Sequence, residues 1–142
     1  DFIPFSRVSG GVWAMTAHIL FEAIDPEFPA TQSKTIIKDV IRGEIGFSGL
    51  LVSDDIGMGA LKGSLSERVL KAFEAGCDVI LHCSGDLSEM KEIAPVVPFL
   101  GSNTVDRIKR SFSVLSAASD RENSFSITCA EEELTEILQE LG

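Results

Sequence analysis

Three short apolar runs, separated by longer amphipathic segments, constrain the fold of this 142-residue chain more than any other feature. The runs are residues 12–17, 49–53 and 77–81. Short runs that are apolar on both faces are typical of strands buried in a parallel sheet. Because parallel neighbours need a crossover connection, usually a helix, the element order predicts an α/β fold in which these runs are adjacent parallel strands.

The first connecting segment contains a proline-bearing loop and a predicted helix. Ser33 is placed to cap this helix, and Gly46 is placed to end it. The apolar positions that share one helical face, and are expected to pack inward, are Ile36, Ile37, Val40, Ile41 and Ile45.

The second connecting segment predicts a helix with two defined ends. Ser64 and Glu67 have the spacing of a capping box, and Gly76 is placed to stop the helix. Its expected inward positions are Leu65, Val69, Leu70 and Phe73.

Further helices are expected after the third apolar run. Asp86 and Glu89 can cap a short helix that ends before Pro95, and Ser102 begins a longer one. The part from residue 117 to residue 142 is expected to hold a polar linking segment and a terminal helix. The apolar face of the longer helix carries Val105, Ile108, Phe112 and Leu115.

Both a doubly wound sheet and a (β/α)8 barrel fit this order of elements. A complete barrel usually takes about 250 residues. If the fold is a barrel, the three predicted strands are less than half of it.

Composition and charge narrow the classes of function. The net charge is −10 at pH 7, and the clustered lysines and arginines that bind nucleic acid are not seen. No apolar run is long enough to predict a membrane span, and the sequence start has no signal-peptide pattern.

Three cysteines without paired CxxC spacing argue against a zinc site or a disulfide scaffold, and favour a reducing cytoplasm. The start at Asp1, without an initiator Met, indicates a cut or processed chain.

Asp54 and Asp55 form the sharpest candidate cluster, in the sequence Ser-Asp-Asp-Ile-Gly-Met of residues 53–58. They follow a buried run, and the carboxyl ends of parallel strands are where such folds carry function. One alternative is that either Asp only caps the following turn. Because adjacent residues leaving a strand point to opposite sides, we expect one carboxylate to face a site and the other to brace the loop.

His18 and His82 end the first and third runs, at positions that match that of Asp54. A lone histidine is more often hydrogen-bonded within the fold, so a structural role stays open for both. Neither has a partner at metal-ligand spacing, and no GxGxxG or P-loop pattern is present. We therefore expect no metal and no cofactor. Met58, taken alone, is typical of packing.

An ordered set of short motifs resembles the β-N-acetylhexosaminidases of glycoside hydrolase family 3, over roughly residues 1–115. The motifs are Ala-Met-Thr-Ala-His-Ile at 14–19, Ile-Asp at 24–25, Pro-Ala-Thr at 29–31 before Ser33, Ile-Arg at 41–42 with Gly-Phe-Ser-Gly at 46–49, Ser-Asp-Asp-Ile-Gly-Met at 53–58, and Ala-Gly-Cys-Asp at 75–78. Single pieces are weak signals, but the ordered set is specific.

The resemblance implies catalytic and binding roles for particular residues. In that family the first Asp of the Ser-Asp-Asp element is the nucleophile of a retaining mechanism, which maps to Asp54. Met58 matches a residue beside the bound sugar, and His18 is expected to bind substrate with it. Asp55 and Met58 favour the N-acetylhexosaminidase branch over the family's β-glucosidases, in which Trp follows Ser-Asp.

The resemblance also implies that this chain lacks the acid/base. In the family that residue is a His on a mobile loop, in a Lys-His-Phe-Pro-Gly-His-Gly-type motif that precedes the Met-Thr-Ala-His strand, and this sequence has no such motif. The chain would then be the C-terminal portion of the barrel, about strands six to eight and the closing helices. We expect it to be inactive alone, and to be covered by the missing N-terminal half or by another copy.

The implied activity is removal of terminal β-linked N-acetylglucosamine from muropeptide or chitooligosaccharide-like substrates, as in cytoplasmic cell-wall recycling. Two alternatives remain open. One is another family 3 β-glycosidase. The other is a non-catalytic half-barrel that assembles with a partner chain.

Overall fold

The computed structural model describes residues 2–119, and the predictions for residues 120–142 lie outside the described part. The chain divides into two compact units, Asp1–Ser111 and Phe112–Gly142. All the strands and all but one of the helices described below belong to the first unit. In the second unit, residues 112–119 are helical.

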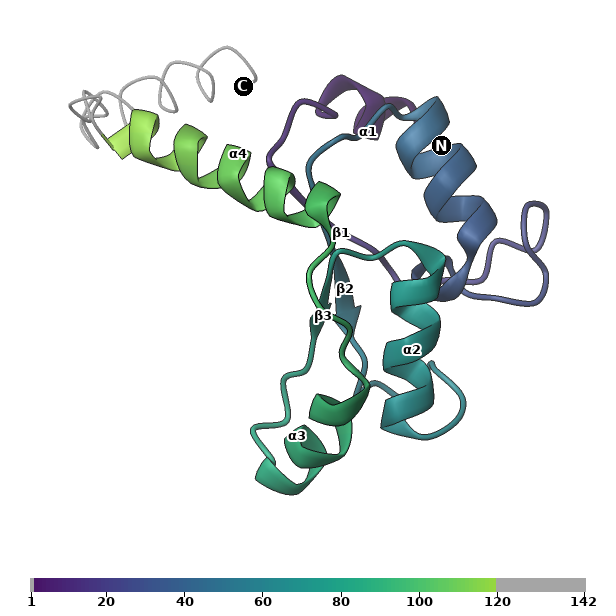
Figure 1. The fold of residues 1–142 in the computed structure, drawn as a ribbon. Coiled ribbons are helices and arrows are strands. Elements are labelled where there is room, and N and C mark those ends of the chain that lie inside the picture. The colour runs from purple at the N-terminus through teal and green to yellow at the C-terminus, as the bar shows by residue number, and fades with distance from the viewer. Residues whose placement is uncertain (1, 120–142) are drawn as a thin grey trace, which may run out of the picture. The chain divides into compact units, whose positions relative to one another are not determined.

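The core of the first unit is a three-stranded parallel sheet (Figure 1). Its strands are β1 (Trp13–Met15), β2 (Leu50–Asp55) and β3 (Val79–Leu81), in the spatial order β1-β2-β3. Both pairings are parallel. The α/β class and the adjacency of the three predicted strands are therefore confirmed.

The register between β2 and β3 shifts near the carboxyl end of β2. Val52 pairs with Val79, and Asp55 pairs with Leu81, so β2 has one residue more than β3 over this stretch. An extra residue of this kind is a β-bulge, which re-aims the side chains beside it. The residues between the two pairs on β2 are Ser53 and Asp54.

The first crossover contains a short turn of 3-10 helix, η1 (Ala30–Gln32), and then η2 (Ile36–Glu44). Ser33 Oγ accepts a hydrogen bond from the Ile36 N–H at 3.0 Å, and Gly46 has a φ of +75°, so both predicted ends are confirmed. The predicted helix has π geometry over Ile36–Glu44. A spacing of five residues separates Ile36 from Ile41 and Val40 from Ile45, and the wider turn keeps each pair on one side.

The second crossover is α2 (Leu65–Ala75). Ser64 and Glu67 form the predicted capping box, and Gly76 ends the helix with a φ of +118°. The prediction that Leu70 faces inward is wrong, because its side chain is 40% exposed. The inward prediction for Val69 is confirmed, and Ala72 and Ala75 are buried with it, at the three-residue spacing that lines one side of a helix.

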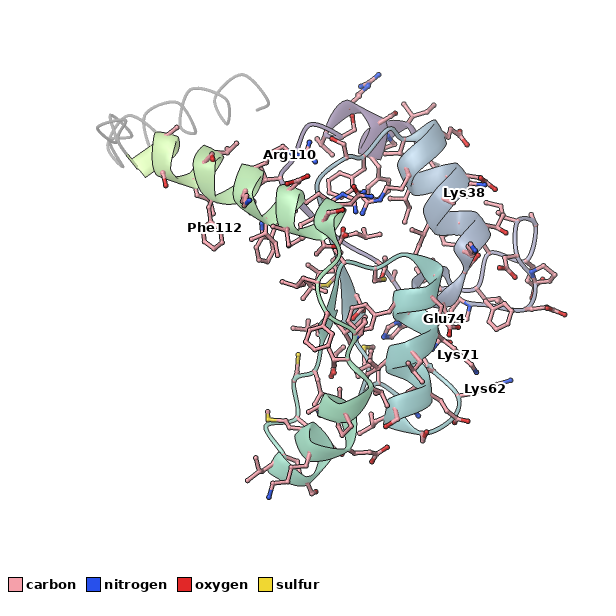
Figure 2. The ribbon with its side chains drawn as sticks, viewed as in Figure 1. Lys38, Lys62, Lys71, Glu74, Arg110 and Phe112 are labelled. Carbon is pink, nitrogen blue, oxygen red and sulfur yellow. The ribbon has the colours of Figure 1, made fainter. Side chains whose placement is uncertain are left out.

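Two apolar clusters join these helices to the sheet. The first contains Ile37 of η2, Leu51 of β2, and Ala72 and Ala75 of α2. The second lies under the loop after β2 and joins Ile56 to Ile93. The opposite faces of η2 and α2 are polar, and Figure 2 shows Lys38, Lys71 and Glu74 on them.

The amino end of the sheet is closed by a buried ion network centred on Asp78. Its side chain is 3% exposed, and its carboxylate oxygens pair with Arg42 at 2.8 Å and Arg107 at 2.6 Å. The same carboxylate accepts the Leu51 N–H and the Thr104 hydroxyl. Buried charges persist when they are paired and hydrogen-bonded, as these are. In parallel α/β folds, function is carried at the opposite, carboxyl end of the sheet.

The remaining helices are α1 (Ile3–Arg7) before β1, and α3 (Leu87–Ile93), η3 (Ala94–Val96) and α4 (Ser102–Ser119) after β3. Asp86 caps α3 by accepting the Ser88 N–H, as predicted. Because α4 continues to Ser119, the first residues of the predicted linking segment are helical. None of the helices in the described part is long and apolar enough to cross a membrane.

Candidate active site

The carboxyl ends of the three strands carry the predicted site residues. Asp54 and Asp55 are the last two residues of β2, while His18 and His82 follow β1 and β3. Parallel strands present these ends at one edge of the sheet. The structure brings His18, Asp55 and His82 into contact there.

Asp54 is half-buried and makes few contacts. Its Oδ1 accepts a hydrogen bond from the backbone N–H of Asp55 at 2.8 Å. Its Oδ2 takes part in none of the hydrogen bonds found among the described residues. The residue lies at the bulge, beside fully buried Ser53, whose Oγ accepts the Leu81 N–H. Asp54 thus has a fixed backbone and one carboxylate oxygen without a protein partner.

The Asp55 carboxylate, unlike that of Asp54, accepts hydrogen bonds from residues outside its own strand. Its Oδ1 accepts the N–H of Gly57 at 3.0 Å and of Cys83 at 3.2 Å, so the side chain ties the loop after β2 to the end of β3. The Gly57 N–H is the largest cause that lowers the pKa of Asp55; Cys83 N–H, His82 and His18 add to it, while burial opposes them. Asp55 is held as a carboxylate, which suits a brace and not a proton donor.

His18 is fixed by hydrogen bonds at both ring nitrogens. Nε2 lies 2.9 Å from the backbone oxygen of Asp55, which can only accept, so Nε2 carries a proton. Nδ1 lies 2.8 Å from Thr31 Oγ1, which lies 2.8 Å from Thr16 Oγ1. In the neutral ring Thr31 donates to His18 and accepts from Thr16. Through these contacts His18 links the end of β1 to the end of β2. The expected contact of His18 with the sugar stays a prediction.

His82 lies on the other side of Asp55, at the end of β3. Its Nε2 is 3.0 Å from Glu89 Oε2 and 2.9 Å from Ser84 Oγ, and its Nδ1 is 3.7 Å from Asp55 Oδ1. The sequence predicted Glu89 only as a cap of α3. Its contact with His82 depends on how α3 folds back beside β3, and no sequence signal reveals this.

The loop between β2 and α2 is held by an arginine that the sequence reading missed. Arg68 donates from Nη1 to the backbone oxygens of Ile56 at 2.9 Å and Met58 at 3.2 Å, and from Nε to Gly63 at 3.0 Å. The signal available was an arginine in the first turns of a helix directly after a glycine-rich loop. Met58 is left with a side chain that is 45% exposed, next to the end of β2.

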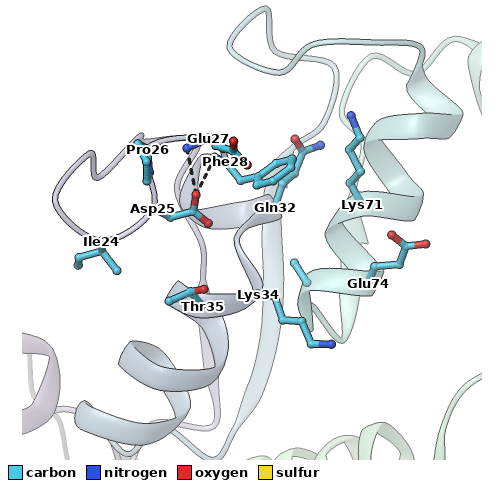
Figure 3. A pocket seen from close by; sticks show the side chains of 11 residues that line it. Ile24, Asp25, Pro26, Glu27, Phe28, Gln32, Lys34, Thr35, Lys71 and Glu74 are labelled. Atoms are coloured by element: carbon cyan, nitrogen blue, oxygen red, sulfur yellow. Dashed lines mark hydrogen bonds between the residues drawn. The ribbon is translucent and has the colours of Figure 1, made fainter.

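A cavity of about 850 Å³ lies away from these residues, between the segment 24–35 and α2 (Figure 3). Its polar lining includes Asp25, Lys34, Lys71 and Glu74, which carry charges of both signs. Asp25 is occupied in capping the turn through the N–H groups of Glu27 and Phe28. No strand-end carboxylate lines this cavity, so the site is placed at Asp54 in spite of the cavity's size. Within the described residues, no group of three or more His, Cys, Asp and Glu side chains could hold a metal ion.

Comparison with known proteins agrees with the resemblance drawn from the motifs. Residues 2–115 match the glycosyl hydrolase family 3 N terminal domain. A beta-hexosaminidase of Alkalilimnicola ehrlichii is 47% identical over 88 residues, which are 59% of this chain and 25% of that protein. One from Nitrosospira multiformis is 38% identical over 116 residues, which are 77% of this chain and 33% of that protein.

Solved structures are also similar to this chain. CbsA from Thermotoga neapolitana has a TM-score of 0.63 and 32% identity, covering 89% of this chain and 31% of its own. A family 3 beta-N-acetylglucosaminidase from Paenibacillus sp. FPU-7 has a TM-score of 0.62 and 29% identity, covering 87% of this chain and 26% of its own. The chain therefore spans about a quarter to a third of its relatives, and it belongs to glycosyl hydrolase family 3.

Proposed function

We propose that this chain supplies the nucleophile of a retaining β-N-acetylhexosaminidase. The observation that carries the proposal is the position of Asp54, on a bulge at the carboxyl end of β2, where its Oδ2 has no hydrogen-bond partner among residues 2–119. Relatives named beta-hexosaminidase support the choice of substrate. The substrate is a terminal β-linked N-acetylglucosamine, in a muropeptide or chitooligosaccharide-like molecule.

In the proposed mechanism Asp54 attacks the anomeric carbon of the sugar. The bond from that carbon to the leaving oxygen breaks, and an ester to Asp54 forms. The leaving oxygen takes a proton from an acid. A water molecule then attacks the same carbon, gives its proton to the base, and releases Asp54 as a carboxylate.

The acid is proposed to come from outside this chain. The nearest carboxyl group in sequence, Asp55, has a lowered pKa and is held ionised by N–H donors, so it has no proton to give. Neighbours in sequence also rarely reach the separation of about 5–5.5 Å, across one bond, that a retaining pair needs. The family resemblance assigns the role to a histidine on a loop that this sequence does not contain.

The three strands are proposed to be strands six to eight of the family's barrel. Within residues 2–119, no strand pairs with the outer edge of β1 or of β3, and open edges are normally covered. Trp13 and Met15 on β1 are 54% and 58% exposed. Beside them an apolar cavity of about 270 Å³ lies between α1, β1 and η2. We propose that the rest of the barrel packs against the exposed residues of β1 and the apolar cavity beside them. The complex of this chain with the rest of the barrel is called the assembled enzyme below.

Met58 and His18 are proposed to contact the sugar beside Asp54, Met58 through its exposed side chain. We place the reaction in the cytoplasm, in keeping with the free thiols of Cys77 and Cys83.

Turnover of aryl glycosides tests the proposal. The assembled enzyme should hydrolyse an aryl β-N-acetylglucosaminide in preference to an aryl β-glucoside, and Asp54→Asn should abolish this turnover. The 142-residue chain alone should be inactive. Preference for the glucoside would favour another family 3 β-glycosidase, and no turnover by any assembly would favour a non-catalytic half-barrel.

A further inference from the structure

His82 contains an unusual buried nitrogen. Among the described residues, His82 Nδ1 is the one buried side-chain nitrogen or oxygen without a hydrogen-bond partner. The side chain is 10% exposed, so water has little access to it. Buried polar atoms are nearly always paired, and an exception calls for a physical explanation.

The other ring nitrogen is held firmly. Ser84 Oγ donates to Glu89 Oε2 at 2.5 Å and is therefore free to accept from His82 Nε2 at 2.9 Å. The same Nε2 lies 3.0 Å from Glu89 Oε2. Both neighbours accept from the ring, so Nε2 carries a proton and the orientation of the imidazole is set by Glu89 and Ser84.

This orientation aims Nδ1 at Asp55. The distance from Nδ1 to Asp55 Oδ1 is 3.7 Å, which is too long for a hydrogen bond but short enough for a direct charge interaction. A proton on Nδ1 would face the carboxylate, whereas a bare Nδ1 would place one lone pair opposite another. Glu89 thus contacts Nε2 and Asp55 faces Nδ1, so each ring nitrogen lies toward a carboxylate.

Asp55 is the residue that joins the site together. It follows Asp54 directly, its N–H contacts Asp54 Oδ1, and its own carboxylate holds the N–H groups of Gly57 and Cys83. Packing around Gly57 is close, since an added Cβ would lie 3.3 Å from Asp55 Oδ1 and 3.6 Å from His82 Cε1. A shift of the Asp55 carboxylate would therefore be passed to the backbone that carries Asp54.

We propose that His82, oriented by Glu89, is a positioning residue that holds the Asp55 carboxylate and thereby fixes Asp54 for attack. The ring acts from the end of β3 through Nδ1 and does not touch the sugar. This inference rests on the proposed function, because the effect is on the reaction of Asp54.

The test compares kcat and KM of the assembled enzyme, of Asp54→Asn and of four further variants on an aryl β-N-acetylglucosaminide. His82→Gln should lower kcat by about 10- to 100-fold, since misplacing a reacting group by about 1 Å can cost that much, and KM should change little. His82→Asn keeps an amide N–H close to the position of Nδ1, and it should retain more activity than His82→Gln. Glu89→Gln should also lower kcat, with KM again changing little. Glu92→Gln is the control, because Glu92 lies on the same helix and contacts Ser66 instead.

The outcomes separate the inference from the proposed function. If Asp54→Asn is inactive while His82→Gln and Glu89→Gln behave like Glu92→Gln, the positioning role is wrong and the nucleophile stands. If Asp54→Asn keeps its turnover, both are wrong. Should His82→Gln fail to fold, Glu89→Gln decides, and an unchanged kcat in that variant would overturn the inference.

Discussion

His18 Nε2 donates to the backbone oxygen of Asp55 across 2.9 Å, although the two residues are 37 positions apart in the sequence. The same oxygen accepts the Met58 N–H at 3.1 Å, and the Asp55 side chain accepts the Cys83 N–H at the end of β3. Asp55, and not the proposed nucleophile, thus ties together the carboxyl ends of all three strands. Changes in its partners should affect both stability and the site.

Thr31→Val should destabilise the fold by about 1–3 kcal/mol, because Thr31 is fully buried and its hydroxyl pairs with both His18 Nδ1 and Thr16 Oγ1. Valine has nearly the same shape but can make neither of these two hydrogen bonds. Urea unfolding measures the change in free energy. The exposed Thr35→Val is the control and should fall within about 0.5 kcal/mol of the parent. Equal values for the two variants would contradict the hydrogen-bonded chain from Thr16 to Asp55.

Gly49→Ala should cost about 1–3 kcal/mol through overpacking at the start of β2. A Cβ at Gly49 would lie 2.6 Å from the backbone oxygen of Val12 and 2.7 Å from that of Gly11, and backbone cannot easily move aside. At Gly59 nothing lies within 4 Å of an added Cβ. Thermal unfolding should therefore separate Gly49→Ala from Gly59→Ala, and a tolerated alanine at both positions would be inconsistent with the close approach of β1 and β2.

Asp55→Asn should remove part of the acid dependence of stability. The pKa of Asp55 is lowered from its ordinary value of 3.8, chiefly by the Gly57 N–H. A lowered pKa stabilises the fold above the unfolded-state pKa, and this stability is lost as the pH falls through the lowered value. Unfolding free energies should therefore differ between parent and variant near neutral pH and converge toward pH 3 and below. A difference that stays constant across this range would argue against an ionised brace.

Arg68→Lys should loosen the loop between β2 and α2. A lysine cannot reproduce the three bonds that Arg68 makes to the backbone oxygens of Ile56, Met58 and Gly63. Limited proteolysis should cut residues 56–64 faster in this variant than in Arg110→Lys, since Arg110 makes one exposed contact at 3.4 Å. Equal rates of cutting would show that the arginine does not hold the loop.

Much of the fold could be predicted from sequence because local signals and burial pointed the same way. The apolar runs gave the parallel strands, and Ser64, Glu67 and Gly76 marked the ends of α2. The different surroundings of Asp54 and Asp55 also followed from their adjacency at a strand end. In the part of the chain that the structure describes, Asp54 Oδ2 makes no hydrogen bond, whereas the Asp55 carboxylate accepts the N–H of Gly57 in the following loop.

The features that sequence could not supply depend on tertiary placement. Leu70 reads as a core position, but α2 turns Ala72 inward because a small side chain lets the helix approach the sheet closely. The contact between His82 and Glu89 likewise arises from packing between separate elements. Such contacts leave no periodic pattern in the sequence.

The most direct test of the account is to trap the glycosyl–enzyme intermediate. A fluorinated N-acetylglucosaminide that slows hydrolysis of the intermediate would be incubated with the assembled enzyme, and the labelled peptide located by mass spectrometry after proteolysis. The account predicts one label, on the Asp54 carboxylate, and no label in Asp54→Asn. A label on Asp55 or on any other residue would contradict the assignment of Asp54 as the nucleophile.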